Sequence, residues 1–484
     1  MIEHSILIGR TGDRIHKLPG TEHVALHART QSGKTTNFCI PNLFYWEGSS
    51  IALDIKVQIH KATAGHRMRN LGQDIYVFDP TARDGRSHCW NQFDAVDRTS
   101  IDRFDQIQRQ TYMMFPENDG SSNSERFWEP AGRNALIAVC NLIAETPSAP
   151  FTMAHILHLF SRGDYHEVLR GMIKRRRKTG PPYSRLTVEG ISDFLSGHPD
   201  MVESIRKTVT TRLAPWGNPR VAAASSRSDF DLRDFRRRPM TLYVRIHPGN
   251  IPRMRPLLRL LFEQFTNLNT DTTPEEDPAL STPVFMLLDE FARLRRMETV
   301  AESLQFLAGF GIRVAIVVQN KAQIRHLYGA NLATDIFDNI GAEIIFGTGD
   351  IALAEELEKR IGHDTVTYDT QNKPRWMAAM QLRRQTISTH PHKIPLLWAQ
   401  EILRLPRDQQ IILRPGMQAM LTERICWYED PHYLALVSPA PIVPKLKVDI
   451  PLDDGSIVIP QRQDRRELQP DEIGRVGRWI NARC

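Results

Sequence analysis

The chain has 484 residues, of which 41% are hydrophobic and 24% are charged. These values are typical of globular proteins and exclude a globally disordered chain, and the length fits roughly two to four domains. No apolar run reaches the roughly 18 residues that cross a bilayer. The formal net charge of +6 is a modest basic excess, compatible with a polyanionic partner. The five scattered cysteines have no zinc-site spacing, so we expect reduced, unlinked thiols.

Short apolar runs between turn-forming residues predict buried strands in two separate regions of the chain. The runs lie at residues 23–28, 50–54 and 75–78 in the first region and at 240–246, 284–289, 313–319 and 343–346 in the second. Helical patterns follow most of these runs. Alternating strands and helices predict an α/β core with a mostly parallel sheet and helices on both faces.

Residues 95–225 differ from the two strand-rich regions, because they have helical periodicity and almost no strand signal. The helical patterns cover residues 101–114, 124–144, 152–160, 164–174, 185–195 and 201–213. We therefore expect an all-α domain of residues 95–225 inserted between two parts of the core, residues 1–94 and 226–438. The tail, residues 439–484, is rich in proline and then highly charged, which predicts an extended arm ending in a short helix.

A phosphate-binding loop follows the first predicted strand. Residues 28–36 read ARTQSGKTT, the pattern G-x-x-x-x-G-K-[ST] with Ala28 in place of the first glycine. Gly33 lets the backbone curl around the β-phosphate, Lys34 neutralises the β- and γ-phosphates, and Thr35 ligates Mg²⁺. An ordinary turn is the alternative, but a strand before the loop and a helix after it favour a nucleotide site. The predicted ATP-binding residues are Arg29, Thr30, Gln31, Ser32, Gly33, Lys34, Thr35 and Thr36.

A second motif is the apolar run of residues 284–288 that ends in Asp289 and Glu290. Asp289 at the carboxyl end of a buried strand can hold Mg²⁺, and Glu290 can polarise the attacking water. Solvated acids at a strand end are the common alternative, which the phosphate loop upstream disfavours. The next strand ends at Gln319, which can sense the γ-phosphate, although such a glutamine is more often a cap or a surface residue. We predict Lys34, Glu290 and Gln319 as catalytic residues, and Thr35 and Asp289 as metal ligands.

These motifs, with further segments along the chain, resemble the type IV coupling proteins, the TraG/TraD-like conjugative DNA-transfer ATPases of bacteria. The similar segments are ARTQSGKTTNFCIPNL (28–43), SIALDIK (50–56), VFDP (77–80), FWE (127–129), LAPWGNPRVAAASSRSDFDLRDF (213–235), FMLLDEFARL (285–294), VQNKAQIRHLYG (318–329), IFGTGD (345–350) and LRLPRDQQIILRP (403–415). The resemblance covers roughly residues 20–435, and the motifs together are specific.

The resemblance implies a RecA-like ATPase core with an inserted all-α domain. It also implies a homo-hexameric ring in the bacterial cytoplasm, peripheral to the inner membrane. Such a ring uses ATP and Mg²⁺ to bring relaxase-bound single-stranded DNA, or an effector protein, to the channel components of a type IV secretion system.

Two features depart from the family pattern. Most members begin with a transmembrane hairpin, whereas this chain starts almost at the first predicted core strand. Either a separate small membrane-anchoring protein replaces the hairpin, or the hairpin was removed. Some members also carry a trans-acting arginine, whose counterpart falls near Ala308, so that Arg313 is the nearest candidate catalytic arginine. An arginine covering the bottom of the sheet is the alternative for Arg313. The next candidates are Arg293, Arg295 and Arg296.

Other functions remain open at this point. The basic run of residues 174–178 could contact DNA phosphates or a relaxase, or be a solvated helix end. A double-stranded DNA pump of the FtsK/HerA kind shares the expected fold, but the helical insertion argues against it. A passive platform that docks a relaxase or an effector is the third possibility, and the intact Lys34, Asp289 and Glu290 argue against it.

Overall fold

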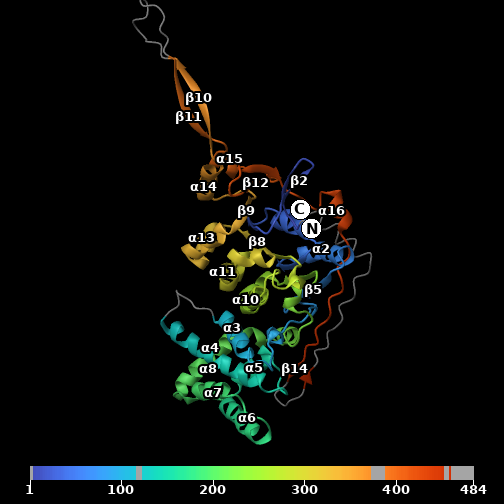
Figure 1. Cartoon of the computed structure of the whole chain (residues 1–484), viewed down its shortest axis with the longest axis vertical. Helices are drawn as coiled ribbons and strands as arrows, with labels where there is room; N and C mark the ends of the chain where they lie inside the picture. Colours follow the sequence, from blue (N-terminus) through green and yellow to red (C-terminus); the bar gives the residue numbers. More distant parts are fainter. Residues whose placement is uncertain (1–3, 116–122, 372–386, 452–456, 459–484) are drawn as a thin grey trace, which may run out of the picture.

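One large sheet organises the chain (Figure 1). The computed structural model describes residues 4–115, 123–371, 387–451 and 457–458. Within them, eleven strands form a mixed sheet in the order β2-β1-β13-β12-β9-β3-β8-β7-β4-β6-β5. The strands are β1 (Ile6–Thr11), β2 (Arg14–Leu18), β3 (His23–His27), β4 (Ser49–Asp54), β5 (Asp74–Phe78), β6 (Met240–Arg245), β7 (Val284–Leu288), β8 (Ile312–Val318), β9 (Ile340–Ile345), β12 (Gln409–Leu413) and β13 (Met420–Glu423).

The part of the sheet from β9 to β5 is parallel throughout. Its seven strands are the seven that the sequence predicts, with ends that differ by at most three residues. Strands β3, β4, β7 and β8 are buried along their whole length, which explains their nearly continuous apolar runs. Because these strands are parallel, the residues that follow β3, β7 and β8 meet at one edge of the sheet.

The other four strands form an antiparallel extension that the sequence analysis missed. β12 pairs with β9, β13 with β12, and β1 with both β13 and β2. The sheet therefore begins at Ile6, before the first predicted strand. The signal for β1 and β2 was a hairpin pattern around Gly12-Asp13, and Gly12 has the positive φ of +55° that such tight turns need. β12 and β13 are short, and each mixes polar with apolar residues.

Helices cover both faces of the sheet, as predicted. One face packs against α1 (Ile40–Tyr45), α2 (Gln58–Arg69) and α16 (Pro431–Leu436). The opposite face packs against α10 (Ile251–Leu268), α11 (Glu298–Leu307), α12 (Lys321–Tyr328) and α13 (Ala330–Asp338). A third cluster joins α14 (Ile351–Ile361) and α15 (Ala399–Leu403) to β9 and β12.

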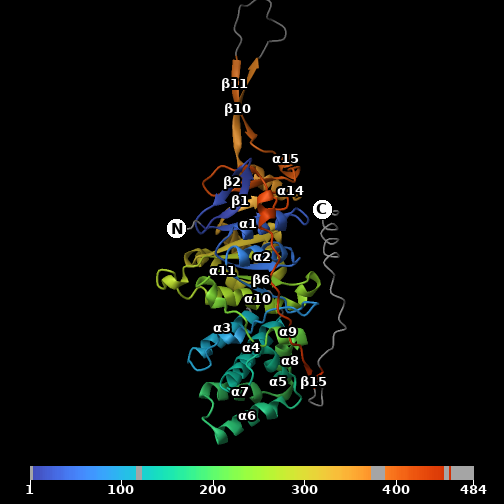
Figure 2. The same ribbon diagram turned by 90° about the vertical axis from the view of Figure 1, so that its right-hand side faces the viewer.

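The segment between β5 and β6 is helical, and the structure confirms all six predicted helices. The segment contains α3 (Arg103–Met114), α4 (Asn123–Ala144), α5 (Met153–Ser161), α6 (Tyr165–Thr179), α7 (Arg185–Ser196), α8 (Pro199–Leu213) and α9 (Pro219–Ala224). It forms one end of the molecule in both views (Figures 1 and 2). Its two connections to the core lie side by side, since the Trp90 N–H donates to the Ala224 carbonyl at 2.8 Å. The division into domains at residues 95 and 225 stays a prediction.

At the opposite end, a two-stranded hairpin of β10 (His363–Gln371) and β11 (Ile387–Pro395) projects from the body (Figure 2). The sequence analysis did not predict this hairpin. No helix among the described residues has the length and apolar character needed to span a membrane.

The described part of the tail is extended up to β14 (Ile450–Pro451), which pairs with β15 (Ile457–Val458). It lies along the loop after β5, where the Leu446 N–H donates to the Gly85 carbonyl at 2.7 Å. This agrees with the predicted arm. The predicted final helix lies outside the described residues, as does the charged stretch 461–469.

Candidate nucleotide-binding site

The phosphate loop connects β3, in the parallel part of the sheet between β8 and β9, to the helix that ends as α1. The Ala28 N–H donates to the Val318 carbonyl at 3.0 Å, so the alanine that replaces the first glycine leaves the strand pairing intact. Gly33 has a φ of +82°, and a Cβ built there would lie 3.1 Å from Nδ2 of Asn37. The loop therefore favours glycine at this position for its left-handed backbone conformation, and a larger residue would also press on the Asn37 side chain.

Lys34 and Thr35 lie in the first helical turn after the loop. Helical backbone begins at Lys34 and passes through a π-helical turn, Thr35–Cys39, into α1. Both side chains are buried, with 4% of Lys34 and 5% of Thr35 exposed. The helix start thus directs a cation and a hydroxyl toward the edge of the sheet where β7 ends.

Asp289 and Glu290 follow β7 and face this helix. The Thr35 hydroxyl donates to Oδ2 of Asp289 at 3.0 Å, and Nζ of Lys34 lies 3.3 Å from Oδ1 of the same carboxylate. Lys34 also forms an ion pair with Glu290. The structure thus brings together four residues that the sequence places about 250 positions apart.

The two carboxylates have different electrostatic environments. Burial raises the pKa of Asp289. Burial also acts to raise the pKa of Glu290, but hydrogen bonds from Lys34 and Arg293 outweigh it, and the pKa is lowered. Glu290 is therefore a carboxylate at neutral pH, the form that can orient a water molecule and accept its proton.

Gln319 and Arg293 also contact Glu290. The side-chain amide of Gln319 donates to the Glu290 carboxylate at 3.3 and 3.4 Å, and Nε of Arg293 donates to it at 2.7 Å. Glu290 has a φ of +70°, a left-handed conformation that is uncommon outside glycine and asparagine. Such outliers cluster at functional sites, which agrees with the role expected for this residue.

The structure does not bring Arg313 to these residues. Its side chain is 2% exposed at the start of β8, at the opposite edge of the sheet. The guanidinium donates to the carbonyls of Glu22, His4 and Leu18 at 2.8 to 3.0 Å, and burial lowers its pKa to about 10. These are the contacts of a structural arginine, the alternative that the sequence left open. A trans-acting role for Arg313 gains no support from this geometry.

Sequence reasoning missed a buried ionic cluster around Glu343 on β9. Its carboxylate lies 3.0 Å from Nε2 of His27, 3.0 Å from Nζ of Lys321 and 2.5 Å from Nη2 of Arg360. Burial opposes ionisation, but hydrogen bonds from His27 and Arg360 lower the pKa of Glu343. The cluster ties the strand before the phosphate loop to α12 and α14. A glutamate inside a predicted apolar strand was the signal available in the sequence.

Arg424, directly after β13, is a second supporting residue that the sequence could not reveal. Its guanidinium donates to the carbonyls of Ser32, Phe346 and Gln409 at 2.7 to 2.9 Å. Arg424 thus holds the backbone of the phosphate loop at Ser32. Ser32 lies 392 positions earlier in the chain, so no local sequence pattern predicts this contact.

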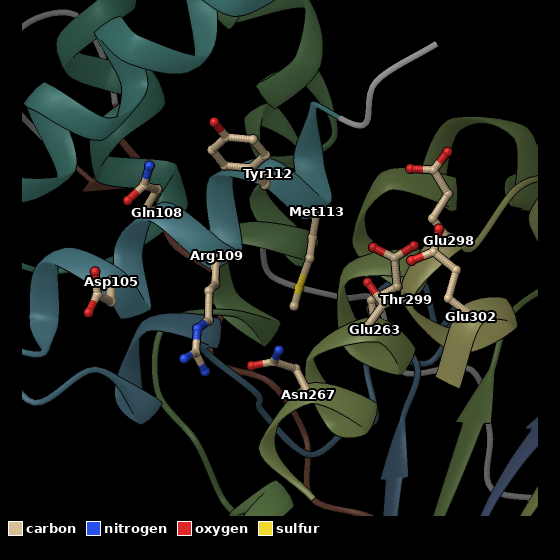
Figure 3. Close-up of a pocket in the computed structure, with 10 residues that line it drawn as sticks. All are labelled: Asp105, Gln108, Arg109, Tyr112, Met113, Glu263, Asn267, Glu298, Thr299 and Glu302. Atoms are coloured by element: carbon tan, nitrogen blue, oxygen red, sulfur yellow. The ribbon is translucent and has the colours of Figure 1, made fainter. Parts of the chain in front are cut away.

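A groove of about 590 Å³ lies between the helical segment and the core (Figure 3). None of the candidate nucleotide-binding residues lines it. Side chains of α3, α10 and α11 line it, and four of them are acidic: Asp105, Glu263, Glu298 and Glu302. Only 2% of Glu263 is exposed, and burial raises its pKa to about 7. Its nearest cation is Arg259, with Nη2 at 3.8 Å.

Glu263→Gln should make the stability of the fold less dependent on pH. The folded chain binds the Glu263 proton more tightly than the unfolded chain does, because the pKa rises from 4.5 to about 7. The wild type should therefore lose stability as pH rises through this window, by about 3 kcal/mol at about 1.36 kcal/mol per pKa unit. We expect the variant to match the wild type near pH 4.5 and to exceed it at about pH 8. Thermal unfolding at a series of pH values measures this.

The exposed Glu302, which lines the same groove, provides the matched control. Glu302→Gln removes the same charge and should keep the wild-type pH profile. Parallel profiles for Glu263→Gln and the wild type would contradict the raised pKa.

The parallel sheet and the loop after β3 together define an α/β fold with a P-loop sequence motif. Residues 5–447 match the sequence model of the family described as Type IV secretory system Conjugative DNA transfer. The chain therefore belongs to this family, the conjugative DNA-transfer coupling proteins of type IV secretion.

Curated relatives agree with this assignment. Protein VirD4 of Agrobacterium fabrum (strain C58 / ATCC 33970) is 25% identical over 416 residues, covering 84% of this chain and 59% of the relative. Conjugal transfer protein TraG of Escherichia coli is 25% identical over 468 residues, covering 88% of this chain and 70% of the relative. The chain thus spans less than two thirds of the length of VirD4.

Solved structures show the same fold. The bacterial conjugative coupling protein TrwBdeltaN70, in complex with sulphate, has a TM-score of 0.61 at 16% identity, covering 83% of this chain and 85% of that chain. Plasmid coupling protein TrwB in complex with ADP and Mg²⁺ has a TM-score of 0.61 at 15% identity, covering 84% of this chain and 87% of that chain. The RecA-like α/β fold with a helical insertion is confirmed.

Proposed function

We propose that this chain is the ATP-hydrolysing motor of a conjugative coupling protein. In this role it links relaxase-bound single-stranded DNA, or an effector protein, to a type IV secretion channel. The observation that carries the proposal is the convergence of Lys34, Thr35, Asp289 and Glu290 at one edge of the sheet. A passive docking platform needs no such arrangement.

The residues present fit a nucleotide with Mg²⁺. The Thr35 hydroxyl and the Asp289 carboxylate are oxygen ligands of the kind that Mg²⁺ prefers, and they already lie within hydrogen-bonding distance. Oδ1 of Asp289 is buried and faces only the ammonium of Lys34, at 3.3 Å, so it becomes available to a metal-bound water once Lys34 turns to the phosphates. When bound, Mg²⁺ supplies positive charge to the β- and γ-phosphates.

The chain's own residues have separate tasks in hydrolysis. Lys34 exchanges its carboxylate partners for the β- and γ-phosphates, which frees Glu290 to orient the attacking water and accept its proton. Gln319 donates to Glu290 in this structure, and in the proposed role it senses the γ-phosphate. The residues from Arg29 to Thr36 surround the phosphates.

We further propose that the active form is a homo-hexamer in the bacterial cytoplasm, peripheral to the inner membrane. A neighbouring subunit would complete each nucleotide site with an arginine. Arg293, Arg295 and Arg296 are the next candidates after Arg313, and of these Arg293 already donates to Glu290 of its own chain.

ATP turnover by the purified chain, with and without single-stranded DNA, tests this function. We expect hydrolysis that single-stranded DNA stimulates. The absence of hydrolysis with all additions would favour the docking platform, and stimulation by double-stranded DNA alone would favour a pump of the FtsK/HerA kind.

A further inference from the structure

A second cavity, of about 300 Å³, adjoins the nucleotide residues. It lies at the carboxyl edge of the sheet, between α10, the loop after β7 and α12. The residues that matter here are Arg255, Arg293, Arg295, Gln319, His326 and Glu290. The cavity therefore shares Glu290 and Gln319 with the proposed catalytic site.

This cavity has an excess of positive charge. Three arginines line it, and Glu290, its one acidic lining residue, already pairs with Lys34 and Arg293. Burial lowers the pKa of Arg255, and the charges of Arg295 and Arg293 lower it further. The guanidinium of Arg295 has no ion-pair or hydrogen-bond partner among the described residues. Of the three arginines, Arg255 and Arg295 thus have no carboxylate partner among the described residues.

The loop that carries two of these arginines is firmly held. The Tyr328 hydroxyl accepts the Met297 N–H at 3.1 Å and donates to the Arg295 carbonyl at 3.2 Å. The Tyr328 ring stacks on Phe291 with centroids 5.6 Å apart. On the other side, Nε of Arg255 donates to the Arg293 carbonyl at 3.0 Å. Arg295 has a φ of +65°, a second unusual backbone conformation in this loop.

From this geometry we infer that the cavity binds a phosphate group and that Arg293 transmits its occupancy to Glu290. Arginine forks match the oxygens of phosphate, and uncompensated arginines favour such a ligand. Arg293 connects the two sites, because it lines the cavity and its Nε also donates to Glu290. A bound phosphate competes with Glu290 for Arg293, and this competition changes how firmly the carboxylate is held.

The phosphate group has two possible sources, a phosphodiester of the transported DNA strand or inorganic phosphate leaving the catalytic site. The role of this phosphate site in transport rests on the proposed function. Binding of phosphate to the cavity, however, does not depend on ATP turnover. Binding and turnover are therefore measured separately, so that a failure of the motor function is not confused with a failure of the cavity.

Arg255→Gln and Arg295→Gln test the cavity. Binding of a fluorescein-labelled oligothymidine is followed by anisotropy, and binding of inorganic phosphate by calorimetry. We expect each variant to weaken binding of at least one ligand roughly tenfold. If the ligand is the oligonucleotide, the slope of log K against log salt should fall by about 0.7 per lost contact. Arg253→Gln is the matched control, since Arg253 is exposed on the same helix and bonds to Asn250.

Weaker binding of the oligonucleotide alone identifies the DNA strand as the source, and weaker binding of inorganic phosphate alone identifies the reaction product. Either result supports the site if two further results hold. Arg295→Lys should retain part of the affinity, and the basal ATP turnover of Arg255→Gln should stay near that of the wild type. The inference is overturned if both affinities equal those of Arg253→Gln. It is also overturned if basal turnover of Arg255→Gln falls as far as that of Glu290→Gln, because the arginines would then belong to the hydrolytic step itself.

Discussion

Lys34→Ala should abolish ATP turnover in a chain that still folds. The substitution removes the cation that would hold the β- and γ-phosphates, and no other lysine or arginine contacts both carboxylates of the site in the described residues. Turnover of the purified variant, with circular dichroism to confirm folding, measures the effect.

The structure adds an expectation about stability for this variant. Lys34 neutralises two carboxylates that are largely buried, so its removal should lower the unfolding temperature in the absence of nucleotide. Lys61→Ala, at an exposed position on α2, is the matched control and should leave both properties unchanged. Wild-type turnover in folded Lys34→Ala would show that residues 28–36 do not form the nucleotide site.

Glu290→Gln should bind ATP and hydrolyse it about 10² to 10⁴ times more slowly. Glutamine keeps the size of the side chain but cannot accept the proton of the attacking water. Lys34 and Thr35 are unchanged, so nucleotide affinity should persist. Single-turnover hydrolysis and the binding of a fluorescent ATP analogue separate the two effects.

Glu302→Gln is again the matched control, because this exposed glutamate on α11 lies outside the nucleotide site. Its turnover should match the wild type. If Glu290→Gln also hydrolysed ATP at the wild-type rate, Glu290 would be a solvated acid and the water would be oriented by another group.

The parallel half of the fold could be predicted from the sequence because its strands are buried on both faces. Such strands read as unbroken apolar runs, and β7 and β8 are clear examples. The antiparallel strands β12 and β13 gave no such signal, since each mixes polar with apolar residues: β12 reads QQIIL and β13 reads MLTE. Motif spacing was sufficient to place Lys34, Asp289 and Glu290, because each follows a buried strand of the same sheet.

The contacts that support the site could not be predicted in this way. Arg424 reaches the phosphate loop from the far end of the chain, and its role depends on a strand order that no local pattern reveals. The structural contacts of Arg313 could not be predicted for a related reason. Its position at the start of β8 was predicted, but the three carbonyls that surround it belong to the unpredicted N-terminal segment and the turn that follows it.

The hydrophobic cluster that joins the helical segment to the sheet has a mechanical consequence. Residues such as Phe93, Phe151 and Leu213 belong to the same continuous cluster as Leu257 and Val300 on the sheet-covering helices. Swinging the helical segment away from the sheet would expose part of this cluster to water, at a cost of about 25 cal/mol for each Å² of apolar surface. In this conformation one continuous hydrophobic core therefore holds the two parts together and resists their separation.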